Sequence, residues 1–329
     1  MNKIIFYHNV YIEQYSSVVG PIEAEGPLKD GFDLCVADLY NGCDNYEHAE
    51  ISLLEDAYDC LLSKVKDKRF DICVGGDLMN QLGVSSYFVR QLQIPFIGCY
   101  AACSNSTLAI NLASLYLNNQ NNQRALVFTS SHYANAEKQF RFPNEYGIQK
   151  KDTVTSTVTG AGCISLCNEK QTIQIVCGMF GEVYDALETD ANDMGSAMVM
   201  ACYRTIVQFF ADGAILYQDV DHIFTGDLSS IGKALLIQML EVDYQDIASK
   251  LDDCGTIIYD IDNQKVFAGG SGCACSMCTL NAYILPGMLD GKYQRVLVVA
   301  TGALLNPIMI QQKESIPCIA HAILLEKCI

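Results

Sequence analysis

The stretch IGCYAACSNSTLAINLASLYL, residues 97–117, is repeated in diverged form by GGSGCACSMCTLNAYILPGML, residues 269–289. The two segments align without a gap. Such a repeat predicts that one supersecondary unit occurs twice in the chain. The identical pairs are Gly98/Gly270, Ala102/Ala274, Cys103/Cys275, Ser104/Ser276, Thr107/Thr279, Leu108/Leu280 and Leu117/Leu289.

The repeat extends on both sides of this core. The strand-like run QRALVFTS from Gln123 matches QRVLVVAT from Gln294, and the turn GDL from Gly76 matches GDL from Gly226. Each half is therefore predicted to run strand, Gly-Asp turn, short apolar segment, cysteine-bearing elbow, helix and strand. In the first half we expect strands over 70–74 and 124–130, the short apolar segment over 94–100 and a helix over 104–117.

The predicted strands are continuous apolar runs without alternation, as expected of strands that are covered on both faces. This pattern indicates a layered α/β fold. Ser104, Asn105 and Ser106 stand where helix N-capping residues are preferred, so Cys103 is predicted to lie at the mouth of an apolar helix. The positive end of a helix favours a thiolate or a bound anion.

The composition narrows the class of protein. The chain has 329 residues, of which 50% are apolar and 18% charged, so it is predicted to be globular. Its net charge of −17 argues against nucleic-acid binding and simple docking on anionic lipid. The start, MNKIIFYHNVYIEQ, is not typical of a signal peptide, and no run of apolar residues is long enough for membrane insertion. We therefore expect a cytoplasmic protein.

The 16 cysteines are interpreted as reduced thiols that pack like small apolar groups. Cys273, Cys275 and Cys278 are close in sequence, but no second cluster has ligand spacing, so a thiol-lined helix start is favoured over a metal site. No EF-hand-like loop occurs. We expect no cofactor, and calcium only as a chelate brought by a ligand.

The first half carries an extra segment. The interval from Ser130 to Cys163 is longer than the equivalent interval from Thr301 to Ala322, and the additional residues lie in a loop over 132–160. This loop is rich in aromatic and cationic side chains. A long loop in a compact domain is often functional.

The two halves, each with a strand, a cysteine elbow and a buried helix, resemble the thiolase fold, which thiolases and ketoacyl synthases share. That fold implies pseudo-duplicated halves, here 1–170 and 171–329, in an α/β/α/β/α arrangement. Longer blocks resemble the stage V sporulation protein AD family; they include VGPIEAEGPL from Val19, TSSHYANAEKQFRFPNEYG from Thr129, FTGDLSSIG from Phe224 and VFAGGSGCACS from Val266.

This second resemblance implies a role in sporulation. The family is implicated in binding dipicolinic acid (pyridine-2,6-dicarboxylate) and in its uptake, with calcium, into the forespore. It works with membrane proteins of the same operon. The resemblance thus implies a location in the cytoplasm or peripherally on the forespore or spore inner membrane. By analogy with the fold, a homodimer is expected.

The resemblance also implies that Cys103 occupies the position of the acyl-accepting cysteine. Thiolase-type chemistry further needs a base and a group that stabilises the oxyanion. The second half normally supplies them as His/His or His/Asn, but the turn after Phe224 and the elbow after Gly269 contain neither residue. Cys318 stands near the position of a second reactive cysteine, and His132 and His321 remain as candidate bases.

A non-catalytic binding protein is the preferred interpretation. The alternatives are an active acyltransferase that uses Cys103 and a scaffold whose pocket is vestigial. A flat dicarboxylate needs N–H donors, a cation and an aromatic or apolar wall. The expected ligand-binding residues lie at the elbow and on the extra loop; they are Cys103, Ser104, His132, Lys138, Arg141 and Phe142, with Tyr133 and Phe140 beside them.

Structural roles for the same residues remain open. Cys103 could be a small buried side chain, His132 a satisfied histidine at a strand end, and Arg141 a residue that stacks between two phenylalanines. Asp77 and Asp227 are interpreted as caps of turns or helices.

Overall fold

The computed structural model describes residues 3–118, 123–140 and 150–328. The described residues form a 13-stranded sheet in which each half of the chain supplies one continuous block of strands. The order is β5-β4-β6-β8-β2 and then β9-β15-β14-β11-β12. Strands β2 and β9 meet at the centre of the sheet. From there outward, the strands of the second block follow the same order as their counterparts in the first.

The strand bounds agree with the predicted elements to within a few residues. The first block comprises β2 (Tyr11–Val19), β4 (Ile72–Gly76), β5 (Phe96–Gly98), β6 (Arg124–Ser131) and β8 (Gly160–Cys167). The second comprises β9 (Ile173–Met179), β11 (His222–Thr225), β12 (Leu251–Asp253), β14 (Arg295–Ala303) and β15 (Pro317–Lys327). Short strands complete the set: β1 (Ile5–Phe6), β3 (Leu34–Cys35) and β10 (Tyr184–Asp185) join the large sheet, and β7 (Ser156–Thr157) pairs with β13 (Gly270–Ser271).

The pairing pattern is the same in both halves. In the first, β4 is parallel to β5 and β6, whereas β8 is antiparallel to its neighbours β6 and β2. In the second, β11 is parallel to β12 and β14, whereas β15 is antiparallel to β14 and β9. All residues of β4, β8 and β11 are buried, which confirms the prediction of strands covered on both faces.

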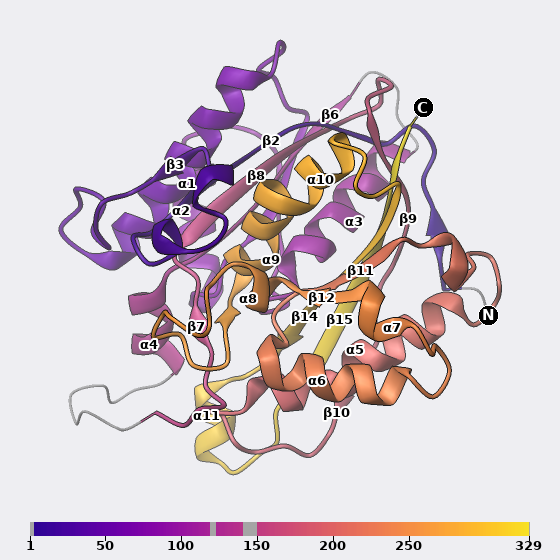
Figure 1. The fold of residues 1–329 in the computed structure, drawn as a ribbon. Helices are drawn as coiled ribbons and strands as arrows, with labels where there is room; N and C mark the ends of the chain where they lie inside the picture. Colours follow the sequence, from indigo (N-terminus) through magenta and orange to yellow (C-terminus); the bar gives the residue numbers. More distant parts are fainter. Residues whose placement is uncertain (1–2, 119–122, 141–149, 329) are drawn as a thin grey trace.

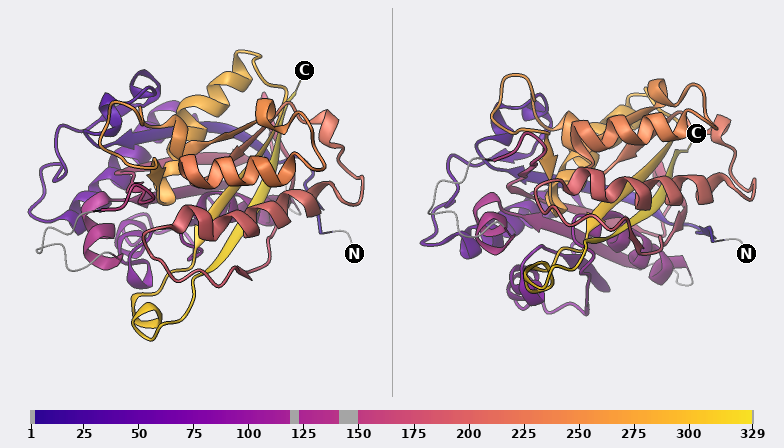
Figure 2. Two further views of the ribbon diagram at one scale, coloured as in Figure 1. Left: turned by 60° about the horizontal axis from the view of Figure 1, so that its bottom comes forward. Right: turned by 90° about the horizontal axis from the view of Figure 1, so that it is seen from below.

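Helices form three layers around these strands. The middle layer holds α3 (Asn105–Asn118) and α9 (Cys273–Thr279), which continues through the π-helical turn η6 (Leu280–Ile284) into α10 (Leu285–Leu289). The outer layers hold α1 (Tyr46–Lys64) and α2 (Gly83–Val89) on the first half, and α5 (Met194–Phe210) and α6 (Ser229–Leu240) on the second (Figures 1 and 2). The remaining helices are α4 (Tyr133–Phe140), α7 (Ile247–Lys250), α8 (Cys254–Ile257), α11 (Pro307–Gln311), and the 3-10 turns η1 (Glu23–Glu25), η2 (Lys29–Gly31), η3 (Asn80–Leu82) and η5 (Tyr217–Asp219).

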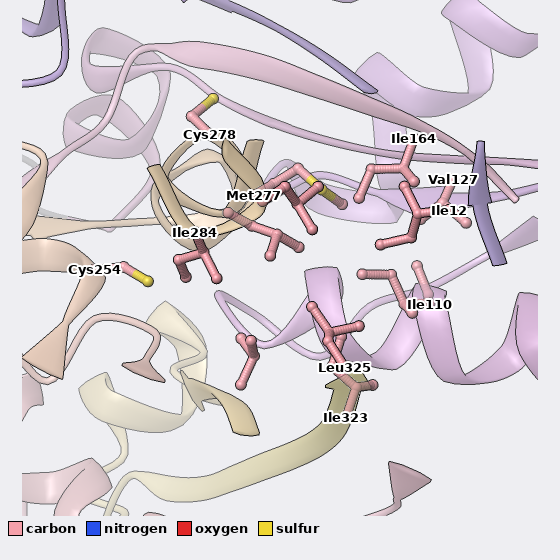
Figure 3. Close-up of a cluster of buried hydrophobic side chains, with 14 of the residues drawn as sticks. Ile12, Ile110, Val127, Ile164, Cys254, Met277, Cys278, Ile284, Ile323 and Leu325 are labelled. Atoms are coloured by element: carbon pink, nitrogen blue, oxygen red, sulfur yellow. The ribbon is translucent and has the colours of Figure 1, made fainter. Parts of the chain in front are cut away.

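The middle layer is the shared core of the two halves. Helix α3 contacts β4 and β6 on one side and β14 and β15 on the other. Figure 3 shows side chains from both halves pointing toward one another there, including Ile110, Met277 and Ile323. Two further cores lie under α1 and α2 and under α5 and α6. The layered α/β/α/β/α arrangement that the resemblance to the thiolase fold implied is thus confirmed.

Candidate functional site

A cavity of about 170 Å³ opens at the elbow before α3. Residues from both halves of the chain line this cavity. They belong to the first elbow, α4, β7, the start of α5, the second elbow and the segment after β14. Figure 1 places β7, α4 and α11 at the same end of the molecule. The lining residues are Leu78, Tyr100, Ala102, Cys103, Ala136, Phe140, Thr157, Met194, Ser271, Gly272, Ala303, Leu304, Leu305 and Asn306.

The elbow is fixed by its own polar groups. Ala102 has a φ of 49°, in the left-handed region that a non-glycine residue seldom adopts. The Ala101 N–H donates to Asn105 Oδ1 (2.7 Å), and the Ser104 hydroxyl donates to the Ala101 carbonyl (2.6 Å). These bonds hold the strained turn, which directs Cys103 into the cavity.

Strand β14 passes directly beneath the elbow at Gly302. A Cβ atom at this position would collide with the Ala101 carbonyl oxygen and crowd the backbone nitrogen of Ser104. Only glycine therefore allows the two halves to meet here without displacement of the elbow.

Gly302→Ala is expected to lower the free energy of unfolding by about 1–3 kcal/mol, because the clash is with backbone atoms that cannot rotate away. Urea denaturation measures this change. Gly83→Ala is the matched control: Gly83 has helical φ and ψ of −59° and −44°, its Cβ would meet open space, and a gain of about 0.4–1 kcal/mol is expected. Equal effects of the two substitutions would contradict the role given to Gly302.

The thiol of Cys103 faces a carboxyl group from the second half. Cys103 donates a hydrogen bond to Asp227, which also accepts from the Thr301 hydroxyl (2.7 Å) and from the Gly272 N–H (3.2 Å). Asp227 follows β11 and is 1% exposed. The carboxyl thus lies behind Cys103 and Gly272, both of which line the cavity.

This arrangement opposes ionisation of the thiol. Burial raises the pKa of Cys103 well above its usual value. The charge of Asp227 and the hydrogen bond from the thiol to this carboxyl raise the pKa of Cys103 further, whereas the Gly272 N–H lowers it. Burial also raises the pKa of Asp227 to about 7. A reactive thiol needs a neighbouring base or cation that favours the thiolate. A carboxylate partner does the reverse.

The interpretation of Asp227 as a cap is wrong, whereas that of Asp77 is confirmed. The Asp77 carboxylate accepts from the N–H of Met79 in its own turn and from the N–H of Ser85 in the first turn of α2. In the second half, Asp253 is the residue that caps the helix. Its carboxylate accepts from the N–H groups of Leu228 and Ser229 at the start of α6. Asp227 is thereby available to face the elbow.

The structure brings Cys103 and Phe140 to the cavity and places the other described candidates, which are Ser104, His132, Tyr133 and Lys138, outside its lining. Ser104 is buried, and its hydroxyl donates a hydrogen bond to the Ala101 carbonyl. His132 is also buried; it contacts the Leu39 carbonyl through Nε2 (2.8 Å) and accepts the Ala134 N–H at Nδ1. Burial lowers its pKa. Lys138 forms an ion pair with Glu47 (2.6 Å). The binding roles of these residues remain predictions.

Arg141 and Phe142 lie outside the described residues. Phe140, directly before them in sequence, lines the cavity. Tyr133 accepts a hydrogen bond from Lys150.

The other candidate reactive groups do not line the cavity. Cys318 is fully buried, its thiol donates to the Ile316 carbonyl, and burial raises its pKa to about 12. His321 accepts the Gly181 N–H at Nδ1, and burial lowers its pKa to about 4. A histidine that stays neutral to such low pH is a weak base for a thiol of raised pKa.

Several polar groups do line the cavity, and sequence reasoning missed them. Thr157 and Ser271 lie on the paired strands β7 and β13, and Ser271 Oγ accepts from Thr155, so its own proton can be donated to a ligand. Tyr100 and Phe140 supply aromatic surface. Among the described residues, none that lines the cavity is a lysine or an arginine.

The described part of the chain lacks two further features. None of its helices is long and apolar enough to cross a membrane. It holds no group of three or more His, Cys, Asp or Glu side chains suited to a metal ion. The cysteines at the second elbow start α9, as expected, and are buried.

Comparisons with known proteins give matches over nearly the whole chain. The family model described as stage V sporulation protein AD matches residues 1–326. The protein of that name from Bacillus subtilis (strain 168) is 44% identical over 326 residues, which cover 98% of this chain and 96% of the relative.

Similar solved structures include 3-oxoacyl-[acyl-carrier-protein] synthase III from Aquifex aeolicus VF5, with a TM-score of 0.59 and 10% identity over 96% of this chain and 99% of that one. A variant of OleA from Xanthomonas campestris has a TM-score of 0.60 and 12% identity over 98% and 99% of the two chains. At such low identity these structures show the fold alone, and they confirm the thiolase-like fold.

Proposed function

The chain belongs to the stage V sporulation protein AD family, and from that premise we propose that its elbow cavity binds dipicolinic acid and does not transform it. The observation that carries the proposal is the contact between Cys103 and Asp227. The position that would hold the nucleophile is open to the cavity, but its partner is a buried carboxyl that keeps the thiol protonated.

The chemistry of acyl transfer supports the same reading. A thiolase-type reaction needs the thiolate, a proton acceptor and donors for the oxyanion. The second-half turn holds Asp227 behind the cavity wall and contains neither a histidine nor an asparagine. The two histidines proposed as bases point elsewhere.

The cavity walls suit a small flat ligand with oxygen atoms. Tyr100 and Phe140 can cover a ring, while Thr157 and Ser271 can donate hydrogen bonds to a carboxylate. A cation is the one required group that the described lining lacks. Arg141, next to Phe140 in sequence, remains the predicted partner of a ligand carboxylate, and a ligand chelated to calcium would need it less.

The wider role is proposed on family membership. The chain acts in uptake of dipicolinic acid into the forespore, together with membrane proteins of the same operon. It is cytoplasmic or peripheral on the forespore or spore inner membrane. Calcium enters only as a chelate with the ligand.

The second candidate is an acyltransferase that uses Cys103. It is favoured by the structural similarity to condensing enzymes and by the place of Cys103 at the start of an apolar helix. Acylation of Cys103 from an acyl-CoA, followed by turnover, would establish it. A scaffold with a vestigial cavity is the third candidate.

Titration of the purified protein with dipicolinate, with and without calcium, separates these candidates. Saturable binding that is weaker in Cys103→Ala and Arg141→Ala supports the proposal. Absence of binding at millimolar ligand would leave only the enzyme or the scaffold.

We also propose a homodimer that forms through β5. This strand ends the sheet, and Ile97 on it is 40% exposed. An uncovered edge strand is prone to pair with another chain. Ile97→Lys is expected to convert dimer to monomer in sedimentation, because a charge would be buried at the paired edge. Val242→Lys, at an apolar side chain 81% exposed on another surface, should leave the dimer intact. A dimer that survives Ile97→Lys would exclude β5 as the contact.

A further inference from the structure

Asp227 is a buried acid in the wall of a cavity that is proposed to hold an anion. Two of its hydrogen-bond partners, Cys103 and Gly272, line the cavity. A ligand carboxylate that reaches the thiol or the Gly272 N–H therefore comes within a few ångströms of the Asp227 carboxyl. Two carboxylates at such separation, out of water, cannot both remain ionised at low cost.

The groups that hydrogen-bond to Asp227 stabilise its charge but are themselves neutral, and they do not outweigh its burial. The elbow contributes the Cys103 thiol, β14 the Thr301 hydroxyl, and the second elbow the Gly272 N–H. From β12, the buried Asp253 adds a like charge that raises the pKa of Asp227 further. Thiols complete the surroundings: those of Cys202, Cys254, Cys273, Cys275 and Cys318 all lie within electrostatic range.

A lysine of α6 in the described chain acts on the neighbouring carboxyls of β12. Lys233 of α6 forms an ion pair with Asp252 (2.7 Å) and lowers the pKa of Asp253. Among the described residues, the main groups that shift the pKa of Asp227 include no cation. Within this part of the chain, a proton is the group that can neutralise the carboxylate.

We propose that the cavity takes up one proton at Asp227 with each anionic ligand that it binds, so that the ligand and the proton are held together. This inference rests on the proposed function, since it assumes that an anion enters the cavity. Release of the ligand must then also release the proton.

The direction of the pH dependence follows from linkage. The pKa of Asp227 is about 7 in the free protein, and a neighbouring anion raises it further. Below about pH 7 the carboxyl is already neutral and binding needs no proton from solvent. Above it, each binding event must protonate the carboxyl, so the affinity falls by up to about tenfold per pH unit until the pKa of the complex is passed.

Calorimetric titration with dipicolinate tests the inference in two ways. Titrations at about pH 8 in two buffers of different ionisation enthalpy give the number of protons exchanged. Uptake approaching one proton per ligand is expected for the unaltered protein. Both ligand carboxyls are already ionised at this pH, so the ligand itself does not take up the proton.

The second arm compares variants across about pH 6–9. Asp227→Asn should bind with a flat pH profile, at the affinity that the unaltered protein has at low pH. Glu50→Gln is the matched control: Glu50 is a buried acid with a pKa raised to about 8, but it contacts Ser130 and Asn135 and does not line the cavity. Its pH profile should match that of the unaltered protein.

The two proposals fail separately. Absence of saturable binding at every pH would reject dipicolinate binding itself. Saturable binding without proton uptake, or a pH dependence that persists in Asp227→Asn, would reject the proton at Asp227 and leave the binding function standing.

Discussion

Replacement of Leu304 by tryptophan is expected to weaken dipicolinate binding by on the order of 100-fold or more, which corresponds to about 2.8 kcal/mol. Leu304 lines the cavity directly after β14 and is partly exposed, so a larger side chain can be accommodated without entering the packed core. Its backbone N–H donates to the Pro317 carbonyl, and this bond is kept in the variant. The indole ring should therefore occupy the volume that the ligand needs.

Calorimetric titration measures the effect, and urea denaturation establishes that the variant is folded. Leu216→Trp is the matched control, because Leu216 is 51% exposed beside η5 and does not line the cavity. It should bind as the unaltered protein does. If Leu304→Trp binds with unchanged affinity, the ligand occupies some other site.

Replacement of Asp227 by asparagine is expected to make Cys103 more reactive toward iodoacetamide. The substitution removes the carboxylate whose charge and hydrogen bond raise the pKa of the thiol, while an amide of the same shape can still meet the Thr301 hydroxyl and the Gly272 N–H. The pKa of the thiol is therefore expected to fall, which raises the thiolate fraction at pH 8 and with it the rate of alkylation. Peptide mass spectrometry at successive times gives the rate at Cys103.

Cys35 is an internal reference in the same experiment, because it is exposed and has no contact with Asp227. Its rate should be equal in both proteins. An unchanged rate at Cys103 in Asp227→Asn would show that the carboxyl does not suppress the thiol, and the main structural argument against catalysis would be lost.

The duplicated elements could be predicted from the sequence because they depend on local patterns. The caps and apolar spacing after Cys103 predicted a helix from Ser104, and α3 begins at Asn105. The apolar run 124–130 corresponds to β6. These features depend on residues close in sequence, so a single chain is sufficient to infer them.

The partners of the site could not be predicted in the same way, because they come from distant segments. The GDL turns of the two halves have the same sequence, but Asp253 of β12 caps α6 and leaves Asp227 to meet Cys103. Nothing local to the second turn indicates this exchange. His132 likewise contacts Leu39, and Lys138 contacts Glu47, through packing that the extra loop does not reveal.

One sequence signal could have pointed to Asp227. The second-half turn lacks the histidine or asparagine that the resemblance leads one to expect, and an acid stands within it. An acid at that place is a candidate partner for Cys103, and the repeat itself supplies the alignment.

The central claim is that the cavity at Cys103 holds dipicolinate and leaves it unchanged. Equilibrium dialysis against dipicolinate tests this claim most directly. Mass spectrometry then gives the masses of the recovered ligand and of the intact protein. We expect saturation at one ligand per chain, recovery of unaltered dipicolinate and an unmodified Cys103. Failure to saturate at millimolar ligand, a chemically altered ligand or a covalent adduct at Cys103 would contradict the claim.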